Sequence, residues 1–123
     1  MADHVVHFEI IGTDPASLQT YYAELFGWQY TAGSAVPAAA YEGGGYGFIG
    51  SEVAGLNGGV GGGPLLQPKV LFYIGVDDVT AALERAEKLG GTPVFGPEGD
   101  PGQLVVARFT DPEGNLIGLA GPK

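Results

Sequence analysis

Two ionisable side chains near the N-terminus, His7 and Glu9, have the spacing that acid–base chemistry requires. In an extended strand, residues two apart point to the same face and lie about 7 Å apart. A histidine titrates near neutral pH, and a neighbouring carboxylate favours its charged form. The pair could therefore share a water molecule or a substrate proton. A histidine that is simply hydrogen-bonded at the rim of a pocket fits the same spacing, so both interpretations stay open.

Other side chains with useful chemistry are spread along the chain. Tyr73 lies in an apolar segment and could direct its hydroxyl into the same space, or pack as a core aromatic. Arg108 is one of two arginines and could bind a ligand carboxylate, although an outward-facing side chain is the simpler prediction. The other residues that we predict to contact a ligand are Tyr41, Tyr46, Phe48, Asn57 and Leu71.

Composition limits the partners of the protein. Acidic residues outnumber basic ones by 14 to 5, and the formal charge of −9 would repel nucleic acids and anionic membranes. The absence of cysteine excludes disulfides, zinc–thiolate sites and cysteine nucleophiles. No apolar run approaches the ~20 residues that span a bilayer, and the N-terminus lacks the order of a signal peptide. We therefore expect a cytoplasmic protein that binds neither nucleic acid nor a membrane.

The first half of the chain predicts a strand, a helix and further strands. Residues 5–11 are rich in β-branched and aromatic types, as in a strand. Asp14 and Pro15 suit the start of a helix over 15–26, and Gly27 suits its end. Residues 28–31 are expected to open a second strand. Residues 43–63 hold eleven glycines, which we interpret as short strands and turns rather than as a phosphate-binding loop.

The helix over 15–26 has one apolar face. Its members recur at helical spacing and are Leu18, Tyr21, Tyr22, Leu25 and Phe26.

The second half repeats this order. A strand over 69–76 precedes a helix that begins after Asp77 and Asp78 and ends at Gly90 and Gly91. The remaining strands are predicted over 92–96, 103–110 and 115–120, with a turn at 111–115.

Internal repetition indicates the architecture. A shift of 63 residues places Gly12 on Gly75, Asp14 on Asp77 and Gly27 on Gly90. A repeat of about 60 residues is typical of a duplicated supersecondary unit whose sheet needs its twin to bury one face. We therefore predict an α+β fold in which two curved sheets enclose a cavity for a small ligand.

The order of these segments resembles the vicinal-oxygen-chelate superfamily, which includes glyoxalases and bleomycin-resistance proteins. The segments that carry the resemblance are 7–10, 21–28, 55–59, 74–79, 89–92 and 111–119. The resemblance implies one domain over 1–123 with two βαβββ modules, at about 4–63 and 68–121, in a curved mixed sheet or half-barrel. It also implies a homodimer.

The resemblance further implies where a metal would be held. His7 matches the first ligand position of the family, but the second falls on Val70 or Leu71, which cannot bind a metal. The closing carboxylate position falls on Gly118, and the matching segment of the first module, 56–60, has no carboxylate. Glu42 and Glu52 could reach inward only with a different strand placement. We therefore expect no cofactor, with a divalent metal ion as the alternative.

Three functions follow. The first is a protein that binds or sequesters a small molecule without metal. The second is an enzyme that uses His7, Glu9 or Tyr73 for metal-free proton transfer. The third is a metal-dependent lyase, isomerase or dioxygenase with an unusual ligand set, and the missing ligands count against it.

Overall fold

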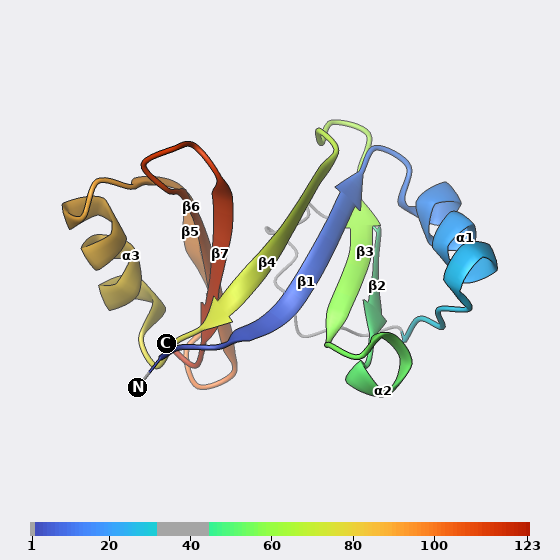
Figure 1. Ribbon diagram of the computed structural model, residues 1–123, viewed down its shortest axis with the longest axis horizontal. Helices are drawn as coiled ribbons and strands as arrows, with labels where there is room; N and C mark the ends of the chain where they lie inside the picture. Colours follow the sequence, from blue (N-terminus) through green and yellow to red (C-terminus); the bar gives the residue numbers. More distant parts are fainter. Residues whose placement is uncertain (1, 32–44) are drawn as a thin grey trace. The chain divides into compact units, whose positions relative to one another are not determined.

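The computed structural model describes residues 2–31 and 45–123 and divides them into two compact units. The first-half unit contains residues 7–31 and 45–70 of the described part, and the second-half unit contains residues 2–6 and 71–123. Each unit combines strands with a helix packed against them (Figure 1). None of the helices in the described ranges has the length and apolar character needed to cross a lipid bilayer.

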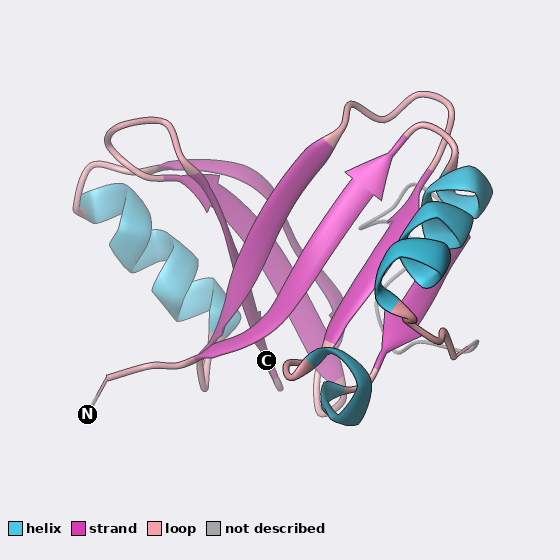
Figure 2. Ribbon diagram, turned by 45° about the vertical axis from the view of Figure 1, so that its right-hand side comes forward, coloured by secondary structure: helices cyan, strands magenta, loops and turns pink. Residues whose placement is uncertain are grey.

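The first-half unit contains three neighbouring strands in the order β2-β3-β1. The strand β1 runs parallel to β3, and β2 runs antiparallel to it. The helix α1 packs mainly against β3 and β2 (Figures 1 and 2). The bounds are β1 Val5–Gly12, α1 Pro15–Phe26, β2 Gly45–Ile49, α2 Ser51–Ala54 and β3 Gly58–Gly62.

The second-half unit has the strand order β4-β7-β6-β5, in which only the β4–β7 pair is parallel. Its core lies between α3 and the strands and contains Val79, Leu83, Val105, Ala107 and Leu119. The bounds are β4 Lys69–Gly75, α3 Val79–Lys88, β5 Thr92–Asp100, β6 Leu104–Thr110 and β7 Leu116–Gly121. The predicted α+β class with mixed sheets is confirmed.

Both helices begin where the sequence predicts. The Asp14 carboxylate accepts a hydrogen bond from the Ser17 N–H, and Pro15 is the first residue of α1. Gly27 ends the helix at a φ of 74°, a left-handed conformation that glycine adopts without steric cost. Asp78 caps α3 in the same way by accepting from the Ala81 N–H.

Three local predictions were wrong. Residues 28–31 form no strand, because the Tyr30 hydroxyl and the Trp28 ring tie them to α1, and only Thr31 bridges to Phe48. The glycine-rich stretch contains the short helix α2, which Gly55 ends with a φ of 84°. The strand predicted over 92–96 continues to Asp100, because irregularities in its pairing let it stay hydrogen-bonded to β6.

The two modules correspond at a shift of 64 residues, rather than 63, over the first strand and the helix start. Glu9 pairs with Gly59 as Tyr73 pairs with Gly118, and Asp14 caps α1 as Asp78 caps α3. The shift of 63 holds only at the helix ends, Gly27 and Gly90, because α3 is shorter than α1. The counterpart of His7 is therefore Leu71.

The backbones of two neighbouring strands approach closely at the end of each parallel strand pair, β1 with β3 and β4 with β7. Gly62 lies against the carbonyl oxygen of Gly12, and Gly121 lies in the same way against that of Val76. A methyl group at either glycine would overlap that oxygen. Gly62 also has a φ of 143°, which side-chain-bearing residues rarely adopt.

We expect Gly62→Ala to lower the free energy of unfolding by about 3 kcal/mol or more, because backbone strain and overpacking add. Gly102→Ala is the matched control, since Gly102 also has a positive φ (88°) but open space around it. It should cost only about 1–2 kcal/mol. Urea unfolding followed by circular dichroism measures both values, and equal losses would contradict the close approach.

Candidate functional site

His7 and Tyr46 are hydrogen-bonded in the first-half unit, with 2.8 Å between the His7 Nε2 and the Tyr46 hydroxyl oxygen. They lie on β1 and β2, which are separated by β3. Neighbouring strands are about 4.8 Å apart, so a side chain must cross roughly 10 Å to join them. Tyr46 can do so because its ring lies over Gly59, where any side chain would collide with it. The pair therefore depends on a glycine between its strands.

Aromatic rings surround the His7 imidazole. The Phe48 ring lies nearly parallel to it, with 6.3 Å between centroids, and the Tyr46 ring lies at 6.5 Å. Burial lowers the pKa of His7 from 6.5 to about 4, so the imidazole is neutral at pH 7. A neutral imidazole has one nitrogen with a free lone pair, and the bond to Tyr46 forms with either group as donor.

Glu9 lies two residues further along β1, on the same face as His7. Its side chain is only 1 % exposed, and Gly59 is its partner in the parallel pairing with β3. His7, Tyr46, Phe48 and Glu9 thus come together in one unit. Tyr73, which the sequence analysis grouped with His7 and Glu9, belongs to the second-half unit.

Tyr73 and Arg108 are hydrogen-bonded in the second-half unit. The Arg108 Nε donates to the Tyr73 hydroxyl at 3.0 Å, and the guanidinium lies 4.7 Å from the Phe95 ring centroid. Gly118 is the pairing partner of both Tyr73 and Arg108, and the Tyr73 ring lies over it. Arg108 is only 8 % exposed. The expectation that Arg108 faces outward was wrong.

The remaining predicted residues have different surroundings. Leu71 is buried, at 4 % exposure, on the same face of β4 as Tyr73. Asn57 is exposed, and its side-chain oxygen accepts from the Ser51 N–H at the start of α2, which is a structural role. Glu52 lies exposed on α2. Tyr41 and Glu42 lie outside the described residues.

Sequence reasoning missed Phe95 and Gln19. Phe95 carries no local signal, because only the pairing of β5 with β6 brings its ring to Arg108. The Gln19 amide donates to the Val60 carbonyl at 2.9 Å and joins α1 to β3. The sequence signal for this contact is that Gln19 is a polar residue on the side of the helix that faces the sheet.

The positions that the resemblance implies for metal ligands have the following occupants. Leu71 takes the second ligand position, and Gly118, beneath the Tyr73 ring, takes the closing position. Gly59, its counterpart in the first module, lies beneath the Tyr46 ring. Within residues 2–31 and 45–123 there is no group of three or more His, Asp or Glu side chains that could hold a metal ion.

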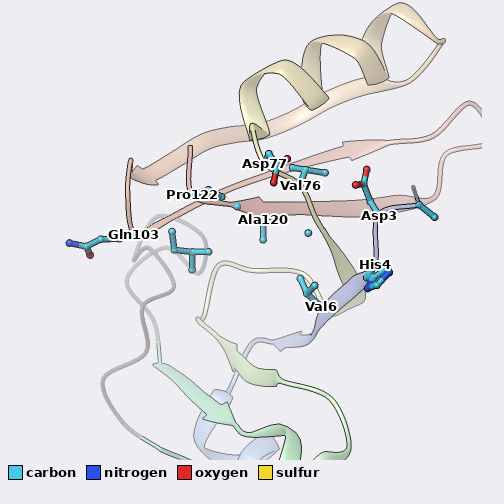
Figure 3. A pocket seen from close by; sticks show the side chains of 12 residues that line it. Asp3, His4, Val6, Val76, Asp77, Gln103, Ala120 and Pro122 are labelled. Carbon is cyan, nitrogen blue, oxygen red and sulfur yellow. The ribbon is translucent and has the colours of Figure 1, made fainter.

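The second-half unit also has an open cavity of about 800 Å³ beside its N-terminal arm (Figure 3). Val6, Val76 and Ala120 contribute apolar side chains to its walls, and Asp3 and His4 contribute polar ones. None of the residues predicted from sequence to form a site is among its lining residues. The prediction of a cavity enclosed by both modules stays a prediction.

Comparison with known families identifies the chain at the level of the superfamily. The model of the glyoxalase/bleomycin resistance protein/dioxygenase superfamily matches residues 4–119. The chain belongs to this superfamily. The resemblance to vicinal-oxygen-chelate proteins is thereby confirmed. No curated protein sequence matches the chain.

Solved structures of this glyoxalase-type fold are similar to the chain. Methylmalonyl-CoA epimerase from Mycobacterium tuberculosis has a TM-score of 0.68 at 14% identity, covering 97% of this chain and 87% of its own. The Streptomyces coelicolor epimerase in complex with 2-nitronate-propionyl-CoA gives 0.68 at 14%, covering 98% of each. A superfamily member from Vibrio splendidus 12B01 gives 0.62 at 15%, covering 98% and 99%. Identities this low show the glyoxalase-type fold alone.

The lowered pKa of His7 predicts a pH dependence of stability. The folded pKa is about 4 and the unfolded value is 6.5, so between these pH values the unfolded chain binds more protons. The free energy of unfolding therefore decreases as the pH falls from about 6.5 towards 4, because protonation of His7 favours the unfolded chain. At pH 4.5 it should destabilise the fold by about 2 kcal/mol relative to pH 7, after allowance for partial solvent exposure.

The measurement is urea unfolding of the wild type and His7→Gln at pH 7 and at pH 4.5. Glutamine keeps a hydrogen-bonding group but has no proton to gain. The variant should lose about 2 kcal/mol less stability than the wild type between the two pH values. Parallel losses in both proteins would show that His7 is not kept neutral by burial.

Proposed function

We propose that the protein binds a small organic molecule at the His7–Tyr46–Phe48 surface of the first-half unit, and that the metal site of its superfamily is degenerate. The observation that supports this most directly is the 2.8 Å hydrogen bond between His7 and Tyr46. This hydrogen bond uses the Nε2 atom of His7, the residue that the resemblance matches to the family's first metal-ligand position. The same bond directs a phenol and a neutral imidazole to one surface, as a ligand with polar groups requires.

The donor set argues against a metal ion. Divalent metals in proteins of this kind need three or more nitrogen and oxygen ligands. Here the second ligand position holds Leu71, and the closing positions hold Gly118 and Gly59. The Tyr73 and Tyr46 rings fill the space above these glycines, where a carboxylate side chain would have to extend. One imidazole alone binds a divalent ion too weakly to retain it.

The proposed surface suits a partly apolar ligand. The Phe48 ring offers an aromatic face 6.3 Å from the His7 ring centroid. The Tyr46 hydroxyl can donate or accept a hydrogen bond, and the neutral His7 can do the same. A ligand with a planar apolar body and one or two oxygen atoms would use both kinds of contact.

Metal-free proton transfer is a second candidate function, and the neutral state of His7 favours it. An imidazole that is unprotonated at pH 7 can accept a proton, and the hydroxyl of Tyr46 lies within hydrogen-bonding distance of it. Glu9 lies on the same strand face and belongs to the same candidate set. Turnover of a small organic acid or ester, lost in His7→Gln, would distinguish this function from binding alone.

We expect metals and organic ligands to affect the purified protein differently. Zn²⁺, Ni²⁺, Mn²⁺ and Co²⁺ should leave the melting temperature unchanged, and elemental analysis should find no stoichiometric metal. A ligand from a screen of small metabolites should raise the melting temperature, and the increase should fall in Tyr46→Phe, which removes only the hydroxyl. Stoichiometric metal that survives chelation but is lost in His7→Ala would instead support a metal-dependent lyase, isomerase or dioxygenase.

We also propose a homodimer, as the resemblance implies. Multi-angle light scattering should give twice the 12.6 kDa mass of one chain at micromolar concentration. A mass that stays at one chain across the concentration range would contradict the dimer without affecting the proposed binding surface.

A further inference from the structure

The apolar face of α1 is exposed. Tyr21, Leu25 and Phe26 are 58 %, 55 % and 57 % exposed, and no residue of α1 is fully buried. The sequence pattern predicts that this face packs against a sheet. The exposed rings therefore require another explanation, because large exposed apolar patches usually mark binding surfaces.

The position of α1 leaves a cavity beside it. The helix packs mainly on β3 and β2, where the Gln19 amide bonds the Val60 carbonyl (Figure 2). The face of β1 that carries Ile10 is left with a cavity of about 520 Å³ against the helix. This volume falls within the range of about 300–1,000 Å³ that is usual for small-molecule sites. Its lining includes Ile10, Asp14, Leu18, Tyr21, Tyr22 and Val70.

The second-half unit has a cavity at the same place, which allows an internal comparison. It measures about 370 Å³, and its lining includes Ile74, Ala82, Arg85 and Ala86. At the shift of 64 residues these four positions correspond to Ile10, Leu18, Tyr21 and Tyr22. The fold thus accepts an arginine and an alanine where the first-half unit has two tyrosines. The second cavity has an aromatic residue, Phe109, elsewhere in its lining, so it is the pair of helix tyrosines that is particular to the first-half unit.

The Tyr21 and Tyr22 rings contact each other edge to face, and Tyr21 is the more exposed of the two, because Tyr22 also stacks against Phe26. Their centroids are 5.1 Å apart and their planes are nearly perpendicular, at 82°. The Tyr22 ring is also stacked against Trp28, which holds it in place. Faces of aromatic rings carry negative potential and attract cations.

The charge beside the cavity is negative. Asp14 is exposed, and the hydrogen bonds from Ser17 hold the pKa of its carboxyl below the usual value, so it is ionised at pH 7. The helix N-terminus carries only about half a positive charge, which the full charge of the carboxylate exceeds. Lys69 also borders the cavity, but alternation places its side chain on the face of β4 that carries Leu71 and Tyr73. An anionic ligand would therefore be repelled.

We propose that the cavity between α1 and β1 is a second binding site, for a small organic cation with an apolar body. The cationic head lies against the Tyr21 and Tyr22 rings near Asp14, and the apolar body lies against Ile10, Leu18 and Val70. This site is on the opposite face of β1 from His7 and Glu9. It goes beyond the proposed function and does not depend on it.

Benzyltrimethylammonium is a suitable probe, with 2-methyl-1-phenylpropan-2-ol as an uncharged analogue of similar shape and phenylacetate as an anion. Binding is measured by two-dimensional amide NMR titration and by calorimetry. We expect the cation to shift amide resonances of residues 10–22. The uncharged analogue should bind about three- to tenfold more weakly, and phenylacetate should not bind. Equal binding of the cation and the uncharged analogue, or shifts confined to other residues, would overturn the proposal.

Variants separate the aromatic and ionic contributions. Tyr21→Leu should weaken binding of the cation by about three- to tenfold, whereas Tyr21→Phe, which keeps the ring, should retain it. Asp14→Asn should also weaken binding while preserving the helix cap, because asparagine caps as well as aspartate. The matched control is Leu25→Ala, an exposed apolar residue of α1 outside the cavity lining. A loss in Leu25→Ala as large as that in Tyr21→Leu would show a general effect on the helix and contradict the site.

The two proposed sites can fail separately. The cation should bind unchanged to Tyr46→Phe, since Tyr46 does not line the cavity. A loss of cation binding in Tyr46→Phe would place the probe at the His7 surface and overturn the second site. Conversely, if the protein retains a metal at His7, or if no metabolite raises its melting temperature, the proposed function fails. The cation titration still tests the second site in that case.

Discussion

Aromatic side chains that cross over glycines are the contacts on which both candidate polar pairs depend. Tyr46 lies over Gly59 to reach His7, and Tyr73 lies over Gly118 to reach Arg108. In each case the glycine is on the strand beside the one that carries the tyrosine, in β3 or β7. A strand interior normally loses stability from glycine. Here the tyrosine ring buries apolar surface against the glycine and places its hydroxyl within hydrogen-bonding distance of His7 or Arg108.

The same contacts change what the superfamily fold can do in this chain. The rings above Gly59 and Gly118 leave no room for a side chain at either position. His7 is held by Tyr46 among aromatic rings and is neutral at pH 7 because burial lowers its pKa. In the metal-free function that we propose, hydrogen bonds and ring contacts take the place of metal coordination.

Comparison of the two modules shows which residues both of them share and which occur in only one. The caps Asp14 and Asp78 and the close approaches at Gly62 and Gly121 recur in both halves, because they satisfy helix N–H groups and fit backbone to backbone. The Tyr21 and Tyr22 pair has no such counterpart, since Arg85 and Ala86 replace it. The two modules therefore share their backbone requirements but differ in the side chains that line the cavity beside each helix.

The sequence by itself determined the features that depend on local backbone chemistry. Asp14, Pro15 and Gly27 fix the bounds of α1, because capping and left-handed conformations restrict residue choice within one turn. Strand alternation likewise placed His7 and Glu9 on one face. Only the tertiary structure decided that Arg108 is buried, that the α1 aromatics are exposed, and that Leu71 is the counterpart of His7. These outcomes depend on which strand lies beside which, and on whether the neighbouring residue is a glycine, and contacts between residues far apart in the chain leave no periodic signal in the sequence.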